Sequence, residues 1–311
     1  SSASATSIRL SVYLPIRSQI AWPGSGKPLV FESKETLYVE FLMLNFTRPT
    51  SAATATDLVW AFQGRHLVNE LMGAPGAPMP LDQLMSDFTT VTDITPVGFL
   101  DDRPVYACVV ETANLDVMKY TSGNLFGLIG RIPTEQFDVI GRAYQLLCWE
   151  RDHRYCGRCG GETSLADKGQ SRACEPCGLS VYPRLSPCVI VLVTRDEELL
   201  LAAGVGSNRR FYSCLAGFVE PGETCEQAVR REVMEEVGVE VGDIEYYGSQ
   251  PWPFPGQLML GFTAKWRGGD INIDPEEIDD ALWCTADNLP PVPPPFSIAG
   301  QLINGFLKSL S

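Results

Sequence analysis

A group of glutamates between residues 220 and 240 carries the strongest chemical signal in this sequence. On a helix, Glu232, Glu235 and Glu236 would fall at positions i, i+3 and i+4, so that their carboxylates share one face. Like charges at this spacing destabilise a helix, so we expect a bound cation to offset their repulsion. Because the group offers only oxygen ligands, it favours Mg²⁺ or Mn²⁺, which prefer phosphate oxygens as further ligands. The pattern predicts phosphate-ester or phosphoanhydride chemistry, and the alternative is a solvated acidic helix face.

Four cysteines form a second cluster with chemical meaning. Cys156 and Cys159 make one Cys-x-x-Cys pair, Cys174 and Cys177 make another, and residues 160 to 173 separate them. This spacing is close to a four-cysteine zinc signature, whose filled tetrahedron leaves no open position for catalysis. We therefore predict one structural Zn²⁺ per chain, and two unlinked redox pairs are the alternative. The other six cysteines lie mostly in apolar contexts, where we expect buried thiols: Cys108, Cys148, Cys188, Cys214, Cys225 and Cys284.

Local signals place the glutamates on a helix from about residue 225 to 237. Thr224 and Gln227 form a capping box, and Gly238 suits a left-handed helix end. An apolar stripe beside the carboxylates would pack on a sheet and consists of Val229, Val233 and Val237. Strand patterns at 188–193 and 199–205 flank a charged turn and predict a hairpin before the helix. Further strands near 244–250 and 257–266 and an amphipathic helix at 296–310 complete a mixed sheet with helices packed against it, an α/β/α sandwich.

The first 150 residues predict a separate unit and a connector. Short β-like runs at 9–14, 36–44 and 103–110 indicate an N-terminal α+β domain over residues 1–132. Thr134 is expected to cap a connecting helix over 133–150, whose apolar positions are Phe137, Ile140, Tyr144 and Leu147. A zinc ribbon at 151–180 and a catalytic domain at 181–311 would follow. No internal repeat is visible in the sequence, and the low-complexity start SSASATS resembles a disordered or processed end.

Composition narrows the classes of function. The chain has 311 residues and is 45% hydrophobic, which is ample for about two domains. Its longest apolar run, 188–193, is far too short for a membrane helix, and no signal peptide is visible, so we expect a soluble cytoplasmic protein without a membrane partner. With 38 acidic and 24 basic residues the formal charge is −14, which opposes non-specific binding to nucleic acid.

The glutamates belong to a longer pattern that resembles a known family. The spacing G-x5-E-x7-R-E-U-x-E-E-x-G-U, with U aliphatic, is matched without a gap by Gly217, Glu223, Arg231, Glu232, Val233, Glu235, Glu236, Gly238 and Val239. This is similar to the box of the Nudix hydrolases. The resemblance implies hydrolysis of a nucleoside diphosphate linked to another group, with divalent metals between the glutamates and the pyrophosphate. It makes the solvated acidic face a poor explanation.

A second motif follows the box and points to one branch of that family. Residues 249–255 read SQPWPFP, where three prolines restrict the backbone around Trp252 and Phe254 and could present a rigid platform to a flat ring. The alternative is a proline-rich loop with its aromatics in the core. In this position the motif resembles the NADH pyrophosphatases, as do the preceding zinc ribbon, the Tyr182-Pro183-Arg184 link and the segment 289–303.

The branch resemblance implies roles for individual residues. The expected ligands of Mg²⁺ or Mn²⁺ are Glu232, Glu235, Glu236 and Glu277 with the carbonyl of Ala216, and Glu276 competes with Glu277. Either Glu236 or Glu277 would activate water. Glu223 would steady the loop and helix, and Arg231 would pair with neighbouring carboxylates and not with substrate. The expected substrate contacts are Tyr182, Phe218, Gln250, Pro251, Trp252, Pro253, Phe254, Pro255, Gly256, Gln257 and Ala299. The branch forms homodimers, so Ala299 would act across the dimer interface. For both Tyr182 and Ala299, the alternative is plain core packing.

Three functions remain open at this point. The first is hydrolysis of NADH or NAD⁺ to nicotinamide mononucleotide and AMP. The second is removal of NAD caps from RNA 5′ ends, with the RNA steered by Arg151, Arg154, Arg158 and Arg172 near the ribbon. The third is a binding module that senses a nucleotide without cutting it, which the complete glutamate set disfavours. Residues 97–107 faintly resemble the catalytically silent first domain of the branch, whereas residues 1–90 resemble nothing known to us.

Overall fold

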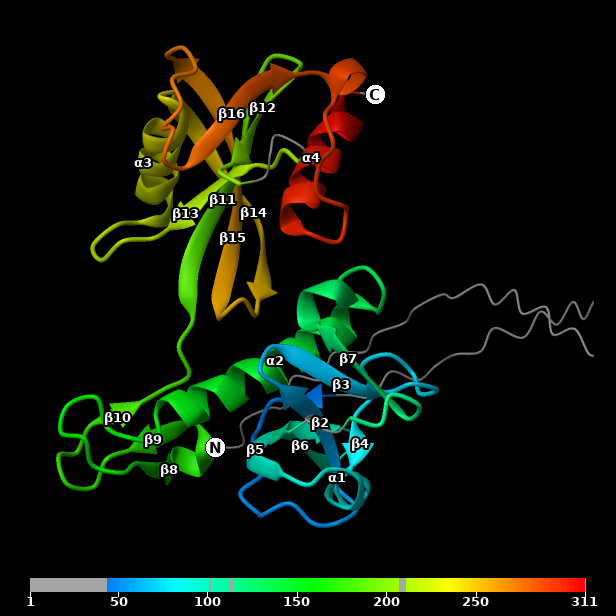
Figure 1. The fold of residues 1–311 in the computed structure, drawn as a ribbon. Helices are drawn as coiled ribbons and strands as arrows, with labels where there is room; N and C mark the ends of the chain where they lie inside the picture. The colour runs from blue at the N-terminus through cyan, green and yellow to red at the C-terminus, as the bar shows by residue number, and fades with distance from the viewer. Residues whose placement is uncertain (1–43, 101, 112–114, 207–210, 311) are drawn as a thin grey trace, which may run out of the picture.

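The structure is a computed structural model that describes residues 44–100, 102–111, 115–206 and 211–310. Two larger sheets and a small three-stranded sheet are joined through one long helix (Figure 1). The runs at 9–14 and 36–43 and the low-complexity start lie outside the described residues. No helix in the described ranges is long and apolar enough to cross a membrane.

The C-terminal sheet has six strands in the order β14-β15-β11-β12-β16, with β13 paired to β11. Its strands are β11 (Ser186–Arg195), β12 (Glu198–Gly204), β13 (Leu215–Phe218), β14 (Glu240–Trp252), β15 (Gln257–Gly268) and β16 (Ile278–Cys284). β11 and β15 run parallel, and the other pairs are antiparallel. Helix α3 (Cys225–Val237) packs on one face and α4 (Ile298–Ser309) on the other (Figure 1). The predicted hairpin, mixed sheet and flanking helices are thus confirmed.

The N-terminal sheet has seven strands in the order β1-β5-β6-β2-β3-β7, with β4 paired to β2. They are β1 (Leu44–Asn45), β2 (Leu58–Gln63), β3 (His66–Glu70), β4 (Met79–Pro80), β5 (Val91–Leu100), β6 (Arg103–Val110) and β7 (Tyr120–Asn124). Apart from β1, this order and every strand direction match the C-terminal sheet, with β2 parallel to β6 as β11 is to β15. Where α3 follows β13, only the seven-residue α1 (Leu81–Asp87) follows β4. One connectivity is therefore used twice, although the sequence shows no repeat.

Helix α2 (Thr134–Asp152) joins the parts of the molecule. Its apolar positions pack into the N-terminal core, as the spacing of Phe137, Ile140, Tyr144 and Leu147 predicted. The expectation that Thr134 caps this helix is wrong, because Pro133 holds the cap position without a side-chain hydrogen bond and Thr134 is already helical. The Pro133 carbonyl accepts from the Phe137 N–H at 3.0 Å and so closes the first turn.

The small sheet follows α2 and consists of β8 (Ser164–Ala166), β9 (Ser171–Ala173) and β10 (Ser180–Val181) in antiparallel order. Three short 3₁₀ helices complete the described elements: η1 (Leu125–Leu128), η2 (Asp167–Gly169) and η3 (Ala286–Asn288). The ribbon and the N-terminal sheet meet near the C-terminal end of α2, on the side away from the C-terminal sheet (Figure 1).

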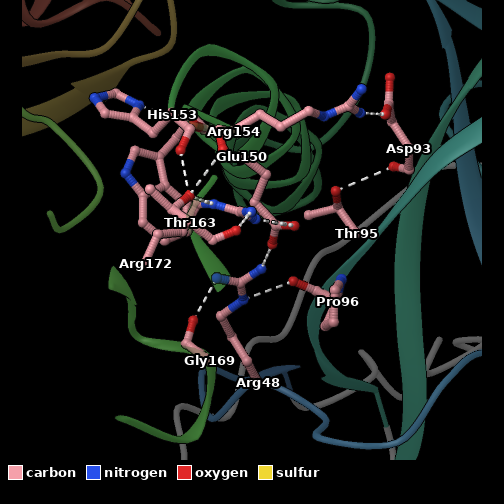
Figure 2. A network of polar contacts seen from close by, with 11 residues as sticks. Arg48, Asp93, Thr95, Pro96, Glu150, His153, Arg154, Thr163, Gly169 and Arg172 are labelled. Atoms are coloured by element: carbon pink, nitrogen blue, oxygen red, sulfur yellow. Dashed lines mark hydrogen bonds and ion pairs between the residues drawn. The ribbon is translucent and has the colours of Figure 1, made fainter. Parts of the chain in front are cut away.

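A buried polar clamp holds the ribbon, α2 and the N-terminal sheet together (Figure 2). The guanidinium of Arg48, only 4% exposed, pairs with Glu150 of α2 and donates to the carbonyls of Gly169 in the ribbon and Pro96 in β5. Arg172 of β9 approaches the other Glu150 oxygen at 3.7 Å. Burial lowers the pKa of Arg48 to about 10, which still leaves it charged at neutral pH. One carboxylate therefore neutralises arginines from two parts of the chain.

We predict that Glu150→Ala destabilises the protein by ~3 kcal/mol, because removal of one partner leaves a buried charge unpaired. The exposed pair of Arg151 and Asp152 provides a matched control, and Asp152→Ala should cost less than ~1 kcal/mol. Thermal unfolding of both variants measures the difference. Equal shifts in Tm for the two variants would show that the clamp contributes nothing special.

Candidate active site and zinc centre

Helix α3 begins and ends as the sequence predicts. The Thr224 hydroxyl accepts from the Gln227 N–H at 3.2 Å, while the Gln227 side chain accepts from the Thr224 N–H at 2.8 Å. Gly238 ends the helix with a φ of 71°, a conformation that favours glycine. The three predicted valines are fully buried against the sheet. Their packing fixes the rotation of the helix and so determines where its carboxylates lie.

The four glutamates among the predicted metal ligands lie in different environments. Glu232 and Glu236 are buried, with Glu236 only 7% exposed, whereas Glu235 is exposed on α3 and Glu277 is exposed just before β16. Burial raises the pKa of Glu236 to about 8, and the charges of Glu232 and Glu277 add to the rise. Burial likewise raises the pKa of Glu232. Two acidic groups are thus held where ionisation is unfavourable unless a cation compensates it.

Glu236 also has an unsatisfied oxygen. Its Oε2 is buried and has no hydrogen-bond partner. A buried acceptor without a partner is costly, and a ligand that binds it recovers that cost. Together with the all-oxygen character of the surrounding glutamates, this orphaned atom fits a hard divalent cation such as Mg²⁺ or Mn²⁺.

Arg231 supplies positive charge to this acidic group. Its guanidinium binds Glu223 at 2.6 Å, Glu232 at 2.8 Å and Glu235 at 2.9 Å. It also donates to the carbonyl of Phe218 at 2.8 Å, which ties β13 to α3. The hydrogen bonds from Arg231 lower the pKa of Glu223 to about 2. Arg231 and Glu223 therefore lie where the sequence placed them, as a brace between the loop and the helix.

The glutamates do not converge on one point in this conformation. Within the described ranges, the four ribbon cysteines are the only group of three or more Cys, His, Asp or Glu residues that is drawn together tightly enough to hold a metal ion. Glu232 and Glu235 are both turned to Arg231, and mutual repulsion of like charges opposes closer approach. Glu277 and Glu276 are both exposed at the edge of the site. Their roles stay predictions.

Gly217 explains why β13 can approach α3 so closely. A Cβ built on Gly217 would lie 1.8 Å from the carboxyl carbon of Glu232, so no other residue fits without a shift. A backbone hydrogen bond from the neighbouring Ala216 opposes the rise in the pKa of Glu236. The backbone of β13 therefore lies directly against both buried glutamates, which is compatible with the predicted role of the Ala216 carbonyl as a ligand.

Part of the predicted substrate set lies on the other face of the same strands. Register pairs place Phe218, Cys188, Met259 and Gln250 in one row across β13, β11, β15 and β14. Trp252 and Ala216 pack on the core that contains Ala299 of α4. Phe218 is half exposed beside this core. Tyr182 is 60% exposed, which argues against the alternative of core packing for this residue. Ala299 is buried, as the same alternative predicted for it.

Gln250 has a structural task that the sequence did not reveal. Its Nε2 donates to the Phe296 carbonyl at 3.0 Å, and its Oε1 accepts from the Ile298 N–H at 2.8 Å. Both ends of the amide are thus engaged with the start of α4. No local pattern signals this contact, because 46 and 48 residues separate the partners.

The rest of the proline-rich loop divides between solvent and the N-terminal domain. Pro251 and Pro255 are exposed, and Gly256 and Gln257 are half buried. Pro253 is buried, and Phe254 packs on the N-terminal core. The alternative interpretation, in which the aromatic residues of this loop lie in a hydrophobic core, therefore holds for Phe254. The core in question is that of the N-terminal domain.

The four ribbon cysteines form the predicted cluster. Their sulfur atoms lie within 4.8 Å of one another, and both knuckles close with hydrogen bonds of 2.8 Å from Gly160 and Gly178, whose φ angles are 74° and 71°. Backbone hydrogen bonds from Cys159 and Arg158 lower the pKa of Cys156 to about 6, whereas a backbone hydrogen bond from Cys177 is outweighed at Cys174 by burial and by hydrogen bonds with the other sulfur atoms, which raise the pKa of Cys174 to about 12. A bound cation would let all four thiols ionise. Of the six cysteines expected to be buried, Cys148 and Cys225 are only half buried.

Three of the four arginines considered for RNA have partners within the protein. Arg154 pairs with Asp93, Arg151 pairs with Asp152, and Arg172 donates to Thr163 at 2.8 Å. Arg158 is exposed at the cysteine knuckle. The basic group near the ribbon is thus partly neutralised.

Comparison with known proteins agrees with both motifs. Residues 184–301 match the NUDIX domain, and residues 151–182 match the NADH pyrophosphatase zinc ribbon domain. The NAD-capped RNA hydrolase NudC of Pseudomonas putida (strain GB-1) is 43% identical over 235 residues, which cover 75% of this chain and 84% of that protein. NudC of Pseudomonas syringae pv. tomato (strain ATCC BAA-871 / DC3000) is 41% identical over 270 residues, covering 85% and 96%. NudC of Pseudomonas aeruginosa (strain LESB58) is 47% identical over 216 residues, covering 69% and 77%.

The raised pKa of Glu236 predicts how stability depends on pH without metal. The folded protein holds this proton up to about pH 8, whereas the unfolded chain releases it near 4.5. Folding is therefore penalised progressively as pH rises between these values. Glu236→Gln should raise Tm at pH 9 in EDTA and change it little at pH 5, while the exposed control Glu245→Gln changes neither. A lower Tm for Glu236→Gln at pH 9 would contradict the burial of an ionised group.

The cysteine cluster predicts a metal content that can be counted. Purified protein should contain about one Zn²⁺ per chain, and Cys174→Ser should lose it because three thiolates bind less tightly than four. Cys148→Ser, a half-buried cysteine outside the cluster, should keep its zinc. Elemental analysis decides, and equal zinc in both variants, or none in the parent protein, would contradict the assignment.

Proposed function

This chain belongs to the Nudix hydrolases that carry the NADH pyrophosphatase zinc ribbon, and from that premise we propose that it hydrolyses the pyrophosphate bond of NADH or NAD⁺. The products would be nicotinamide mononucleotide and AMP. The observation that carries the proposal is the buried, unpaired Oε2 of Glu236 beside Glu232 in a complete Nudix box. A group of this kind suits a bound divalent cation, and a pyrophosphate is the ligand that such a cation shares.

The proposed metal ligands are Glu232, Glu235, Glu236, Glu277 and the carbonyl of Ala216. Bound Mg²⁺ or Mn²⁺ would neutralise charge on the pyrophosphate and lower the pKa of the attacking water. Glu236 is one candidate to orient or deprotonate the attacking water, because it lies buried beside Glu232 and a bound cation would keep its carboxylate ionised. Glu277 is the alternative base, and its exposed position leaves room for substrate beside it. Arg231 would keep Glu223 and the loop before α3 in place.

The nucleobase would bind on the opposite side of β13. Phe218 and Tyr182 present exposed rings, and Trp252 and Ala299 provide the adjoining wall. Aromatic faces of this kind bind flat heterocycles by stacking. The rest of the 250–257 loop would set the shape of the pocket, with Gln250 acting through its hold on α4.

A second candidate is removal of the NAD cap from RNA, an activity named in the relatives NudC. The same glutamates would cut the same bond, and exposed Arg158 would approach the RNA backbone. A homodimer completed by Ala299 and a cytoplasmic location remain parts of the proposal. A nucleotide sensor without hydrolysis is the least supported candidate, since it requires no complete set of metal ligands.

The proposal predicts specific products and a specific loss. With Mg²⁺ or Mn²⁺ the protein should convert NADH to nicotinamide mononucleotide and AMP, and Glu235→Gln and Glu236→Gln should each reduce kcat at least ~10²-fold. Glu245→Gln, an exposed glutamate away from α3, should keep normal turnover. Chromatography of products from NADH, NAD⁺, ADP-ribose and capped RNA ranks the substrates. Intact NADH with every metal, or losses below tenfold in both variants, would refute the proposal.

A further inference from the structure

The proline-rich loop of the catalytic domain spans two hydrophobic cores. Trp252 packs on the core between the C-terminal sheet and α4, while Phe254 packs on the core between the N-terminal sheet and α2. The two rings meet edge to face, with centroids 5.4 Å apart. In Figure 1 the tip of the β14–β15 hairpin accordingly reaches down to α2. The orientation of Trp252 thus depends on what the N-terminal domain places against this tip.

Phe126 is the aromatic residue that the N-terminal domain presents there. Its ring lies 6.0 Å from that of Trp252 at 89° and 5.6 Å from that of Phe254 at 60°, in the range of favourable aromatic pairs. The ring is nevertheless 57% exposed, so burial in its own domain does not account for its position. It joins the two loop rings in an aromatic cluster that Phe137 of α2 extends, with the Phe137 ring 6.4 Å from that of Phe254 but in no described pair with Trp252.

The backbone that carries Phe126 is well anchored. Phe126 belongs to η1, where the Asn124 side chain accepts from the Phe126 N–H at 2.9 Å. The preceding Leu125 is 1% exposed and lies in the N-terminal core. One residue of η1 therefore points into its own domain and the next points toward the loop.

Other contacts fix the base of the loop, and the indole itself has the C-terminal core on one side. Pro253 packs on α2 so tightly that a Cβ on Gly141 would lie 3.0 Å from its ring, and Phe296 packs likewise on Gly130. The Phe254 N–H donates to the Trp252 carbonyl at 2.9 Å, which holds the backbone. Among the described aromatic pairs, Trp252 contacts only Phe126 and Phe254. The outer side of the Trp252 ring is therefore supported by Phe126.

We propose that Phe126 is a positioning residue, which holds Trp252 in the orientation that the nucleobase pocket requires. The inference rests on the proposed function, since Trp252 is placed there in the wall of that pocket. Without Phe126 the indole would gain rotamers that substrate binding must then remove, and this ordering weakens affinity. Loss of the Phe126 ring should not affect hydrolysis of the pyrophosphate, because the glutamates lie on the α3 side of β13. A domain without catalytic glutamates thereby contributes to substrate binding.

Steady-state kinetics test the proposal through the division between KM and kcat. Phe126→Ala should raise KM for NADH about 5–10-fold and change kcat less than about twofold. Phe126→Tyr keeps the ring and should restore KM. Met72→Ala, which removes a 94% exposed side chain from the same domain, is the control and should match the parent protein. An unchanged KM in Phe126→Ala, or a fall in kcat that the tyrosine does not rescue, would overturn the proposal.

Amide hydrogen exchange gives a second readout that needs no activity. Phe126→Ala should accelerate exchange in residues 250–257 and leave α3 unchanged, whereas Met72→Ala should affect neither. Unchanged exchange in the loop would contradict the positioning role even if the enzyme is active. Conversely, a parent protein that cleaves no dinucleotide would refute the proposed function, while faster exchange in Phe126→Ala would still support Phe126 as the support of Trp252.

Discussion

The structure of the site is governed by one electrostatic constraint, which is that carboxylates crowded on α3 must be compensated. Arg231 compensates Glu223, Glu232 and Glu235, but Glu236 is left buried with a free oxygen and a raised pKa. The packing of α3 keeps the Glu236 carboxyl out of contact with solvent, and the backbone of Gly217 lies directly against the Glu232 carboxyl. Stability and activity therefore make opposite demands on Glu236, a common property of catalytic groups. A divalent cation bound as we propose would reconcile them.

Residues far from Glu236 hold the proline-rich loop and the domains around it in place. Gln250 connects the proline-rich loop to α4, and Phe254 connects it to the N-terminal core. The Arg48 and Glu150 clamp fixes the ribbon and the N-terminal sheet to α2. The N-terminal sheet repeats the connectivity of the catalytic sheet but carries the short α1 in place of α3. In the described part of this domain, the core beneath the sheet receives Phe254 of the loop.

Sequence reasoning succeeded where the cause is local. The capping box at Thr224, the stop at Gly238 and the cysteine knuckles depend on neighbouring residues, and all were predicted. It failed at the start of α2, where Pro133 was overlooked as the cap. It also missed the task of Gln250 and the closeness of Gly217 to Glu232, because these depend on residues brought together only by the fold. The resemblance of residues 97–107 to the catalytically silent first domain of the branch is consistent with the repeated connectivity, in which they contribute to β5 and β6. The roles of the predicted metal ligands and pocket residues stay predictions.

The central claim is that divalent cations bind between the glutamates of α3 and the pyrophosphate of a dinucleotide. Anomalous diffraction from crystals grown with Mn²⁺ and NADH, or with a non-hydrolysable analogue, tests it most directly. The account predicts manganese peaks in contact with Glu236 and Glu232 and with the bridging phosphates, with the glutamates drawn away from Arg231. Clear density for the dinucleotide with no manganese at α3, or with its phosphates turned to another surface, would contradict it.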